Sequence, residues 1–229
     1  LDNRNCSTST NPVNDWRNCT QVTPTGRSEA DERTNYATWF SYHRTRMKAA
    51  KAGSGVAFDG LAGNVRVGFR TIWQRQPGGT RPANEPTQAI PIPVQYNDGL
   101  FVDPNGTTGA LNNRTQWYNR LYGAIGYNGT PLKGALQQAG LYYSSNSSNG
   151  PYGPQAAASQ YSCRQNFTIL TTDGYWNNNS NYVAVDEQDN TPGPTVTGPG
   201  NQSFTYSAVA PYASADSNTL ADVAMRYWK

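Results

Sequence analysis

Two oxygen-bearing side chains stand where an α/β protein would bind a ligand. Asp173 directly follows the apolar, β-branched run 166–172, which has the character of a buried strand. Thr130 precedes Pro131 and a stripe of small apolar residues, a pattern typical of a helix N-terminus. Because strand ends and helix N-termini gather at one edge of such a sheet, the hydroxyl and the carboxylate are expected to meet there. Hard oxygen ligands of this kind suit Mg²⁺ or Ca²⁺, so the pair predicts a metal site.

Each of these residues also has a purely structural interpretation. Thr130 would be a plain helix cap, whose side chain accepts a hydrogen bond from an early backbone N–H group. Asp173 and Gly174 would form a turn, a role in which Asp-Gly pairs are common. The residues alone leave both interpretations open.

Other catalytic arrangements fit the residue types poorly, and no enzyme is expected. A glycosidase needs two acids held roughly 5–10 Å apart, but three of the four glutamates fall in predicted loop or tail and none follows a strand. A Ser/His/Asp triad would need the single histidine, His43, which falls on the apolar face of a predicted helix and is expected to be at least partly buried. The acids within 186–189 could bind Ca²⁺, although a solvated acidic turn is favoured.

Aromatic side chains gather in and beside two long loops near the predicted ligand edge. The candidates for surface contact are Tyr152, Tyr175 and Trp176. Aromatic loops offer contact area with little loss of rotamer entropy. Packing of the same rings onto the domain is the alternative.

The three cysteines favour an oxidising compartment. Cys6 and Cys19 bracket a polar, turn-rich stretch that cannot form its own core, and a disulfide between them would stabilise the loop by about 3 kcal/mol. Cys163 precedes a predicted strand. The odd count leaves it free, paired outside the chain, or paired with Cys6 or Cys19. Because no C-x-x-C spacing occurs and there is one histidine, a Cys/His zinc site is not expected.

Helix and strand patterns alternate along the chain, which predicts an α/β architecture. Period-2 alternation predicts a strand at 64–73, and the run 166–172 predicts a second strand in the same sheet, with helices on both faces. Gly53 and Gly55 are expected to end the first helix. Helices are predicted at about 35–52, at 113–122, from Thr130 onward, and after a cap at Ser217 or Asn218.

The composition is that of a secreted or cell-surface protein. Charged residues make up 14% and hydrophobic residues 36%, both below the averages for soluble proteins. No run approaches the roughly 18 apolar residues of a membrane span. The basic residues are scattered, which argues against nucleic-acid binding.

Several segments resemble known families. The run 167–174 (FTILTTDG) is similar to the strand and metal aspartate of von Willebrand factor A domains, and 129–136 (GTPLKGAL) to their second metal motif, a threonine that opens a helix. The resemblance implies a doubly wound, mainly parallel sheet with long loop insertions, and Thr130 and Asp173 as metal ligands. Four blocks in the same order resemble, more narrowly, the PilY family of type IV pilus tip adhesins and assembly factors: 35–51, 66–69, 161–176 and 217–228.

The resemblance also implies that the domain is incomplete. The first metal motif of such domains, Asp-x-Ser-x-Ser, does not occur in the sequence, and neither the first strand, the last strands nor the C-terminal β-propeller of the family is matched. We therefore expect a fragment of a longer protein, with an irregular N-terminal segment or insertion at 1–34 and a partial von Willebrand A-like domain at 35–229. Insertions are expected at about 74–110, 144–165 and 175–216.

The function implied by the resemblance is binding rather than catalysis. The chain would be an adhesive and assembly module of a type IV pilus tip protein, exported through the periplasm to the cell surface. Its implied partners are minor pilins or the pilus tip and a host or abiotic surface, with a contact that can depend on metal. The alternative is a secreted carbohydrate-active enzyme or carbohydrate-binding domain. The adhesin requires Thr130 and Asp173 to meet at one sheet edge, whereas the enzyme requires two carboxylates facing one cleft.

Overall fold

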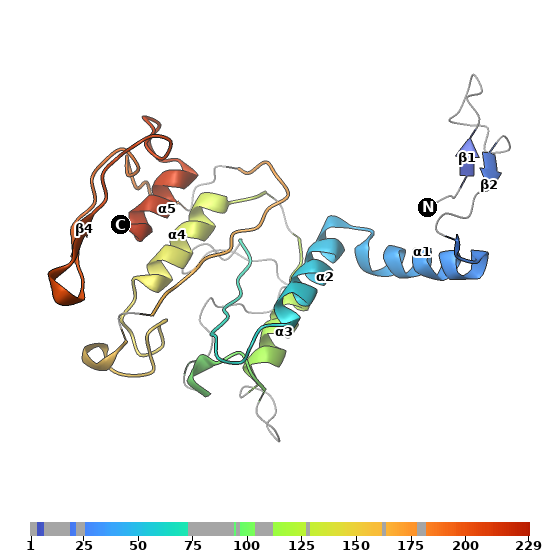
Figure 1. Ribbon diagram of the computed structural model, residues 1–229, viewed down its shortest axis with the longest axis horizontal. Coiled ribbons are helices and arrows are strands. Elements are labelled where there is room, and N and C mark those ends of the chain that lie inside the picture. The colour runs from blue at the N-terminus through green and yellow to red at the C-terminus, as the bar shows by residue number, and fades with distance from the viewer. Residues whose placement is uncertain are drawn as a thin grey trace. The chain divides into compact units, whose positions relative to one another are not determined.

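The computed structural model describes the chain in two compact units, Leu1–Val56 and Ala57–Lys229. The described residues are 4–6, 19–21, 26–72, 94, 97–103, 112–126, 129–161, 164–177 and 182–229. Figure 1 shows the chain with the α-helices and most of the strands labelled.

The first unit contains a short hairpin and two helices. Strands β1 (Arg4–Cys6) and β2 (Cys19–Gln21) pair antiparallel, so the stretch 1–34, expected to be irregular, contains regular structure. Helix α1 (Glu29–His43) begins after Ser28, whose hydroxyl accepts a hydrogen bond from the Asp31 N–H at 3.2 Å. Helix α2 (Arg46–Asp59) continues into the second unit.

The helix predicted at about 35–52 is two helices that break at 44–45. Gly53 and Gly55 lie inside α2 and do not end it. A glycine within a helix costs only about 1 kcal/mol, which the flanking residues can offset. The prediction for His43 is also wrong, because His43 is exposed and no side chain of α1 is buried.

The core of the second unit is aromatic. Helix α3 (Asn113–Gly123) supplies Trp117 and Leu121, which are buried with Phe101. The Trp117 ring lies 4.6 Å from the Phe58 ring and 5.6 Å from the Phe101 ring, centroid to centroid. Such aromatic pairs stabilise a core beyond the area they bury.

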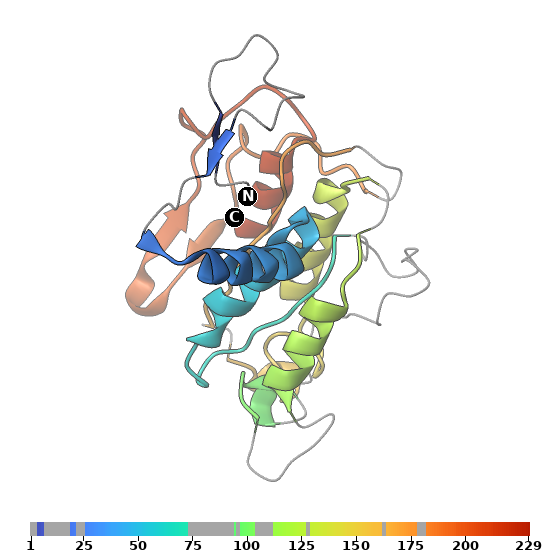
Figure 2. The ribbon, with the colours of Figure 1, turned by 90° about the vertical axis from the view of Figure 1, so that its right-hand side faces the viewer.

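Helices α4 (Leu132–Tyr143) and α5 (Leu220–Trp228) lie side by side in both views of the ribbon (Figure 1, Figure 2). Leu132 and Val223 are buried. Gly140 permits the close approach, because a side chain there would overlap the ring of Tyr227. The two helices therefore form one packed pair, although they are far apart in the sequence.

Helix positions agree with the sequence prediction better than helix ends do. Helix α3 begins at the predicted residue and ends one residue later than expected. Helix α4 begins at Leu132, with Pro131 in the cap position. The cap of α5 is Thr219, not Ser217 or Asn218, because Thr219 and Asp222 form a reciprocal capping box.

Neither predicted strand forms. Arg66 makes one isolated antiparallel bridge to Leu100, the rest of 64–72 is irregular, and residue 73 lies outside the described residues. The run 166–172 is irregular, with Phe167 and Ile169 exposed by 75% and 78%. A strand requires hydrogen bonds from a neighbouring strand, and none reaches this run from the described residues.

The described sheets are two antiparallel hairpins. Besides β1–β2, strands β3 (Thr195–Thr197) and β4 (Ser203–Thr205) pair with Val196 opposite Phe204. The mixture of helix and strand agrees with an α/β composition, whereas the described residues contain no parallel sheet. The two predicted strands therefore do not share a sheet.

A nearly buried arginine fixes the loops beside the segment 164–177. Arg66 donates hydrogen bonds to the carbonyl oxygens of Pro151 at 2.8 Å and Gly153 at 3.0 Å, and it pairs with the carboxylate of Asp98. Arg164 donates to the same Gly153 oxygen at 3.3 Å. One side chain thus ties together loops that lie about 85 residues apart in the sequence.

None of the described helices combines the length and the apolar character needed to cross a membrane.

Candidate functional site

The N-terminus of α4 is held by its neighbour and not by a side-chain cap. No side chain of a described residue caps the helix. The Thr130 N–H donates a hydrogen bond to Asn177 Oδ1 at 2.7 Å, and the Thr130 carbonyl accepts one from the Asn177 N–H at 2.9 Å. The interpretation of Thr130 as a plain helix cap is therefore wrong. Its hydroxyl makes no hydrogen bond to any residue that the structure describes.

Gly129 makes room for this contact. A Cβ atom on residue 129 would lie 2.5 Å from Asn177 Oδ1, closer than real Cβ contacts, and 3.1 Å from Asn177 Cγ, tighter than most of them. The Gly-Thr pair that precedes α4 therefore accommodates the side chain of Asn177. This role of Asn177 was not predicted from the sequence, and an unexplained glycine before the helix is the signal that could have indicated a close contact there.

A second contact joins the same segment to the first turn of α4. Lys133 Nζ lies 5.4 Å from the ring centroid of Trp176 and 4.8 Å from that of Tyr182. The same ammonium donates a hydrogen bond to the Asn218 carbonyl at 2.7 Å. A cation over aromatic faces is attracted by their negative quadrupole, so Lys133 holds Trp176 against the helix.

Asp173 lies in the segment that these contacts hold. The main-chain contacts of Thr130 go to Asn177, four residues after Asp173. Asp173 is exposed in a bend, and Gly174 has φ +141°, which L side chains rarely adopt. The structure therefore brings Thr130 to Asn177, and neither Thr130 nor Asp173 lies in or beside a described strand, so the expected sheet edge does not join them. The backbone at Asp173 has the character of an Asp-Gly turn.

The three candidate contact aromatics differ in exposure. Tyr175 is completely exposed, whereas Trp176 is about one-third exposed and packs near Lys133. Tyr152 is half-buried, and its hydroxyl accepts a hydrogen bond from Asn166 Nδ2 at 2.9 Å. Of the three, Tyr175 has the exposure that surface contact requires.

Cys6 and Cys19 face each other across the β1–β2 ladder as directly opposed residues. Opposed residues of an antiparallel pair have Cα atoms about 4.5–5.5 Å apart, within the range that a disulfide spans. Cys163 lies outside the described residues.

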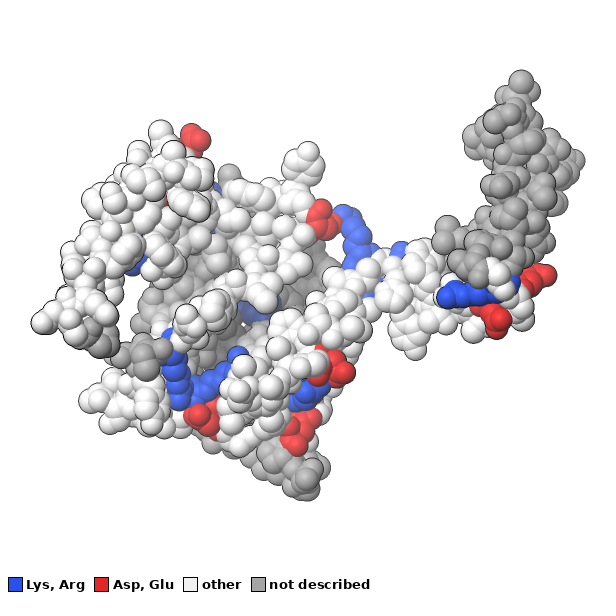
Figure 3. Space-filling model, in the orientation of Figure 1, with Lys and Arg blue, Asp and Glu red and all other residues white. Residues whose placement is uncertain are grey.

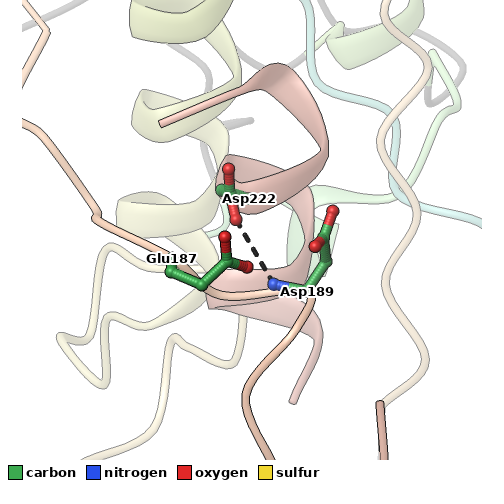
Figure 4. A group of neighbouring side chains, drawn as sticks. All are labelled: Glu187, Asp189 and Asp222. Carbon is green, nitrogen blue, oxygen red and sulfur yellow. Dashed lines mark hydrogen bonds between the residues drawn. The ribbon is translucent and has the colours of Figure 1, made fainter. Parts of the chain in front are cut away.

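Three carboxylates converge elsewhere in the second unit, between the turn at 187–191 and α5 (Figure 4). One oxygen each of Glu187, Asp189 and Asp222 lies within 4.8 Å of the others. Asp186 is not in this group, and Asp189 is 1% exposed. The expected solvated acidic turn is therefore wrong for Asp189.

Asp222 is completely buried and organises this region. Its Oδ1 accepts hydrogen bonds from the N–H groups of Gln188 at 2.7 Å and Asp189 at 3.3 Å, and its Oδ2 accepts them from the N–H and hydroxyl of Thr219 at 2.8 and 2.9 Å. Burial acts to raise the pKa of Asp222, but these hydrogen bonds favour the charged form more strongly and hold the pKa below its ordinary value.

The other two carboxylates also bond to the backbone. Asp189 Oδ1 accepts from the Ser214 N–H at 2.9 Å, and Glu187 Oε1 accepts from the Asn190 N–H at 2.8 Å. These oxygens thus order the turns at 187–190 and before 214. The sequence analysis missed Asp222, although a threonine three residues before it forms a recognisable capping pattern.

Comparison with known proteins shows which proteins the chain is similar to. No protein-family model matches it, and neither does a solved structure. It is 31% identical over 214 residues to the "Type IV pilus biogenesis factor PilY1" of Pseudomonas aeruginosa strain PAK, and 32% identical over 202 residues to the protein of that name from strain PAO1. The matches cover 88% and 86% of this chain but 16% of each relative, so the chain spans about a sixth of their length. Over most of its own length, the chain is related to the type IV pilus biogenesis factor PilY1.

Proposed function

We propose that this chain is a binding module of a type IV pilus tip protein that is exported through the periplasm and acts at the cell surface. One observation carries the proposal: 31–32% identity to PilY1 proteins extends over 86–88% of the chain. The name of these relatives is that of a biogenesis factor and specifies no reaction. Assembly and adhesion are therefore favoured over catalysis.

The proposed partners are minor pilins or the pilus tip, together with a host or abiotic surface as the adhesive target. Two features of the second unit support a role in contact. Most of its drawn surface is uncharged (Figure 3), in line with the low content of charged residues. Tyr175 is completely exposed, and a tyrosine offers a large amphipathic contact area at a small entropic cost.

The proposed metal contact would use Thr130 and Asp173. Their hydroxyl and carboxylate oxygens match Mg²⁺ or Ca²⁺ in type, but two protein ligands are few for either ion. Further oxygens would have to come from a longer natural protein or from an acidic group of the partner. We infer that adhesion depends on metal in the full-length natural protein and that residues 1–229 alone bind the ion poorly.

The test is calorimetric titration of the full-length natural protein with Mg²⁺. Asp173→Ala should weaken binding several-fold or more, whereas the matched change Asp216→Ala, also at an exposed aspartate, should have no effect. Equal Mg²⁺ affinity for the full-length protein and for residues 1–229, or no effect of Asp173→Ala, would contradict the metal contact.

Adhesion is tested in the bacterium that makes the protein. Cells carrying Tyr175→Ala should assemble pili but attach less to a surface. Cells carrying Tyr212→Ala, at another exposed tyrosine that lies outside segment 164–177, should attach normally. Cells that lack the whole protein should lose surface pili. Normal piliation and attachment without the protein would contradict the proposed function.

A further inference from the structure

We propose that Asn177 is a positioning residue that holds segment 173–177 on the N-terminus of α4. The Asn177 clasp consists of the two hydrogen bonds between Asn177 and the Thr130 main chain, together with the space left by Gly129. Asn177 acts as both acceptor and donor toward one residue. A glycine or alanine at position 177 would keep the main-chain bond and lose the side-chain bond.

The clasp is reinforced one residue earlier in the chain. Trp176 lies against the Lys133 ammonium, which is itself anchored to the carbonyl of Asn218. Asn177 and Trp176 thus contact Thr130, just before the cap, and Lys133 in the first helical turn. Two adjacent contacts restrain a segment more than either does alone, because the second forms with a smaller further loss of chain entropy.

The consequence is the location of Asp173. Asp173 lies four positions before Asn177, so even a fully extended backbone keeps its Cα within about 14 Å of Asn177. With the clasp closed, the Asp173 Cα therefore stays within about 14 Å of Asn177, whose hydrogen bonds go to Thr130. This consequence for metal binding rests on the proposed function, whereas the clasp itself does not.

The clasp can be tested by amide hydrogen exchange followed by NMR. In Asn177→Ala, the Thr130 N–H loses its acceptor and should exchange about tenfold faster, the size expected from one lost hydrogen bond. Asn177→Asp keeps an acceptor oxygen and should restore slow exchange. The Val223 amide in α5, which bonds to the Thr219 carbonyl, should not change in any of these variants.

A double-mutant cycle with Gly129 tests the geometry. Gly129→Ala should speed Thr130 exchange as much as Asn177→Ala does, because the added Cβ displaces the Asn177 side chain. In the double variant the clash is removed, since only the Cβ of residue 177 remains, at 3.6 Å. The double variant should therefore match Asn177→Ala alone.

Several results would overturn the inference. These are unchanged Thr130 exchange in Asn177→Ala, additive effects in the double variant, or equally faster exchange of Val223, which would indicate general destabilisation.

Mg²⁺ titration of the full-length natural protein then separates the two proposals. A loss of affinity in Asn177→Ala that approaches that of Asp173→Ala supports positioning, and unchanged affinity overturns it. Absence of Mg²⁺ binding by the unaltered protein overturns the metal contact, while the exchange result still decides the clasp.

Discussion

The buried carboxylate of Asp222 accepts four hydrogen bonds from the turn before α5 and from its cap. Asp222→Ala would leave these donors without their acceptor, so we expect a loss of roughly 2–4 kcal/mol in the free energy of unfolding. Urea denaturation measures the change. Asp216→Ala removes an exposed carboxylate and should cost less than about 0.5 kcal/mol. Equal effects of the two substitutions would contradict the role assigned to Asp222.

Because the pKa of Asp222 is lowered, the stability that its carboxylate contributes should depend on pH. A carboxylate with a depressed pKa in the folded state contributes stability that is fully present above its unfolded value of about 3.9, and that is lost as pH falls through that value and then through the folded pKa. The difference in unfolding free energy between the unaltered chain and Asp222→Asn should therefore be largest near pH 7 and shrink toward pH 3. Urea denaturation at several pH values tests this. A constant difference across that range would show that the charge of Asp222 does not matter.

At the scale of elements, Gly140 controls the packing of α4 on α5. Gly140→Ala places a methyl group against the ring of Tyr227, so we expect a destabilisation of roughly 1–3 kcal/mol from overpacking. The matched control is Gly53→Ala in α2, where an added Cβ meets nothing within 4 Å. There the better helix propensity of alanine should stabilise by roughly 0.5–1 kcal/mol. Thermal unfolding followed by circular dichroism compares the two, and a shift of the same sign in both would contradict the predicted contact.

Helices were predictable because their signals are local. The spacing of Trp117 and Leu121 and the proline before Leu132 indicated α3 and α4 to within one or two residues. The start of α5 was misplaced by one or two residues, although Thr219 and Asp222 have the three-residue spacing of a capping box. Gly53 was misjudged because a helix can continue through a glycine when the flanking residues favour it.

Strands and the site depend on contacts between distant residues, which a sequence pattern does not contain. Phe167 and Ile169 have the composition of a buried strand, yet both are exposed. Thr130 and Asp173 were predicted as partners from the usual position of such residues, whereas the observed partner of Thr130 is Asn177. Asn177 lies 47 positions away, and Gly129 before the helix indicates only that something packs there, not which residue it is.

At the scale of the whole molecule, the state of the cysteines reports the compartment in which the chain folds. The opposed positions of Cys6 and Cys19 in β1–β2 favour the disulfide expected from their spacing. In the exported protein, denatured without reductant, one thiol should react with an alkylating agent, and three should react after reduction. Cys163→Ser should leave no reactive thiol, and Cys6→Ser should leave two. Three reactive thiols before reduction would contradict both the disulfide and the oxidising compartment.

The pairing of α4 with α5 also has a kinetic consequence. Lys133, in the first turn of α4, bonds to Asn218, just before α5, across 85 positions of chain. Contacts of such long range slow folding, because a large loop must close before they form. Helix α4 can form within microseconds from local interactions, but its apolar face remains uncovered until residues 220–228 arrive. Refolding should therefore pass through a period of exposed apolar surface, in which yield falls as protein concentration rises.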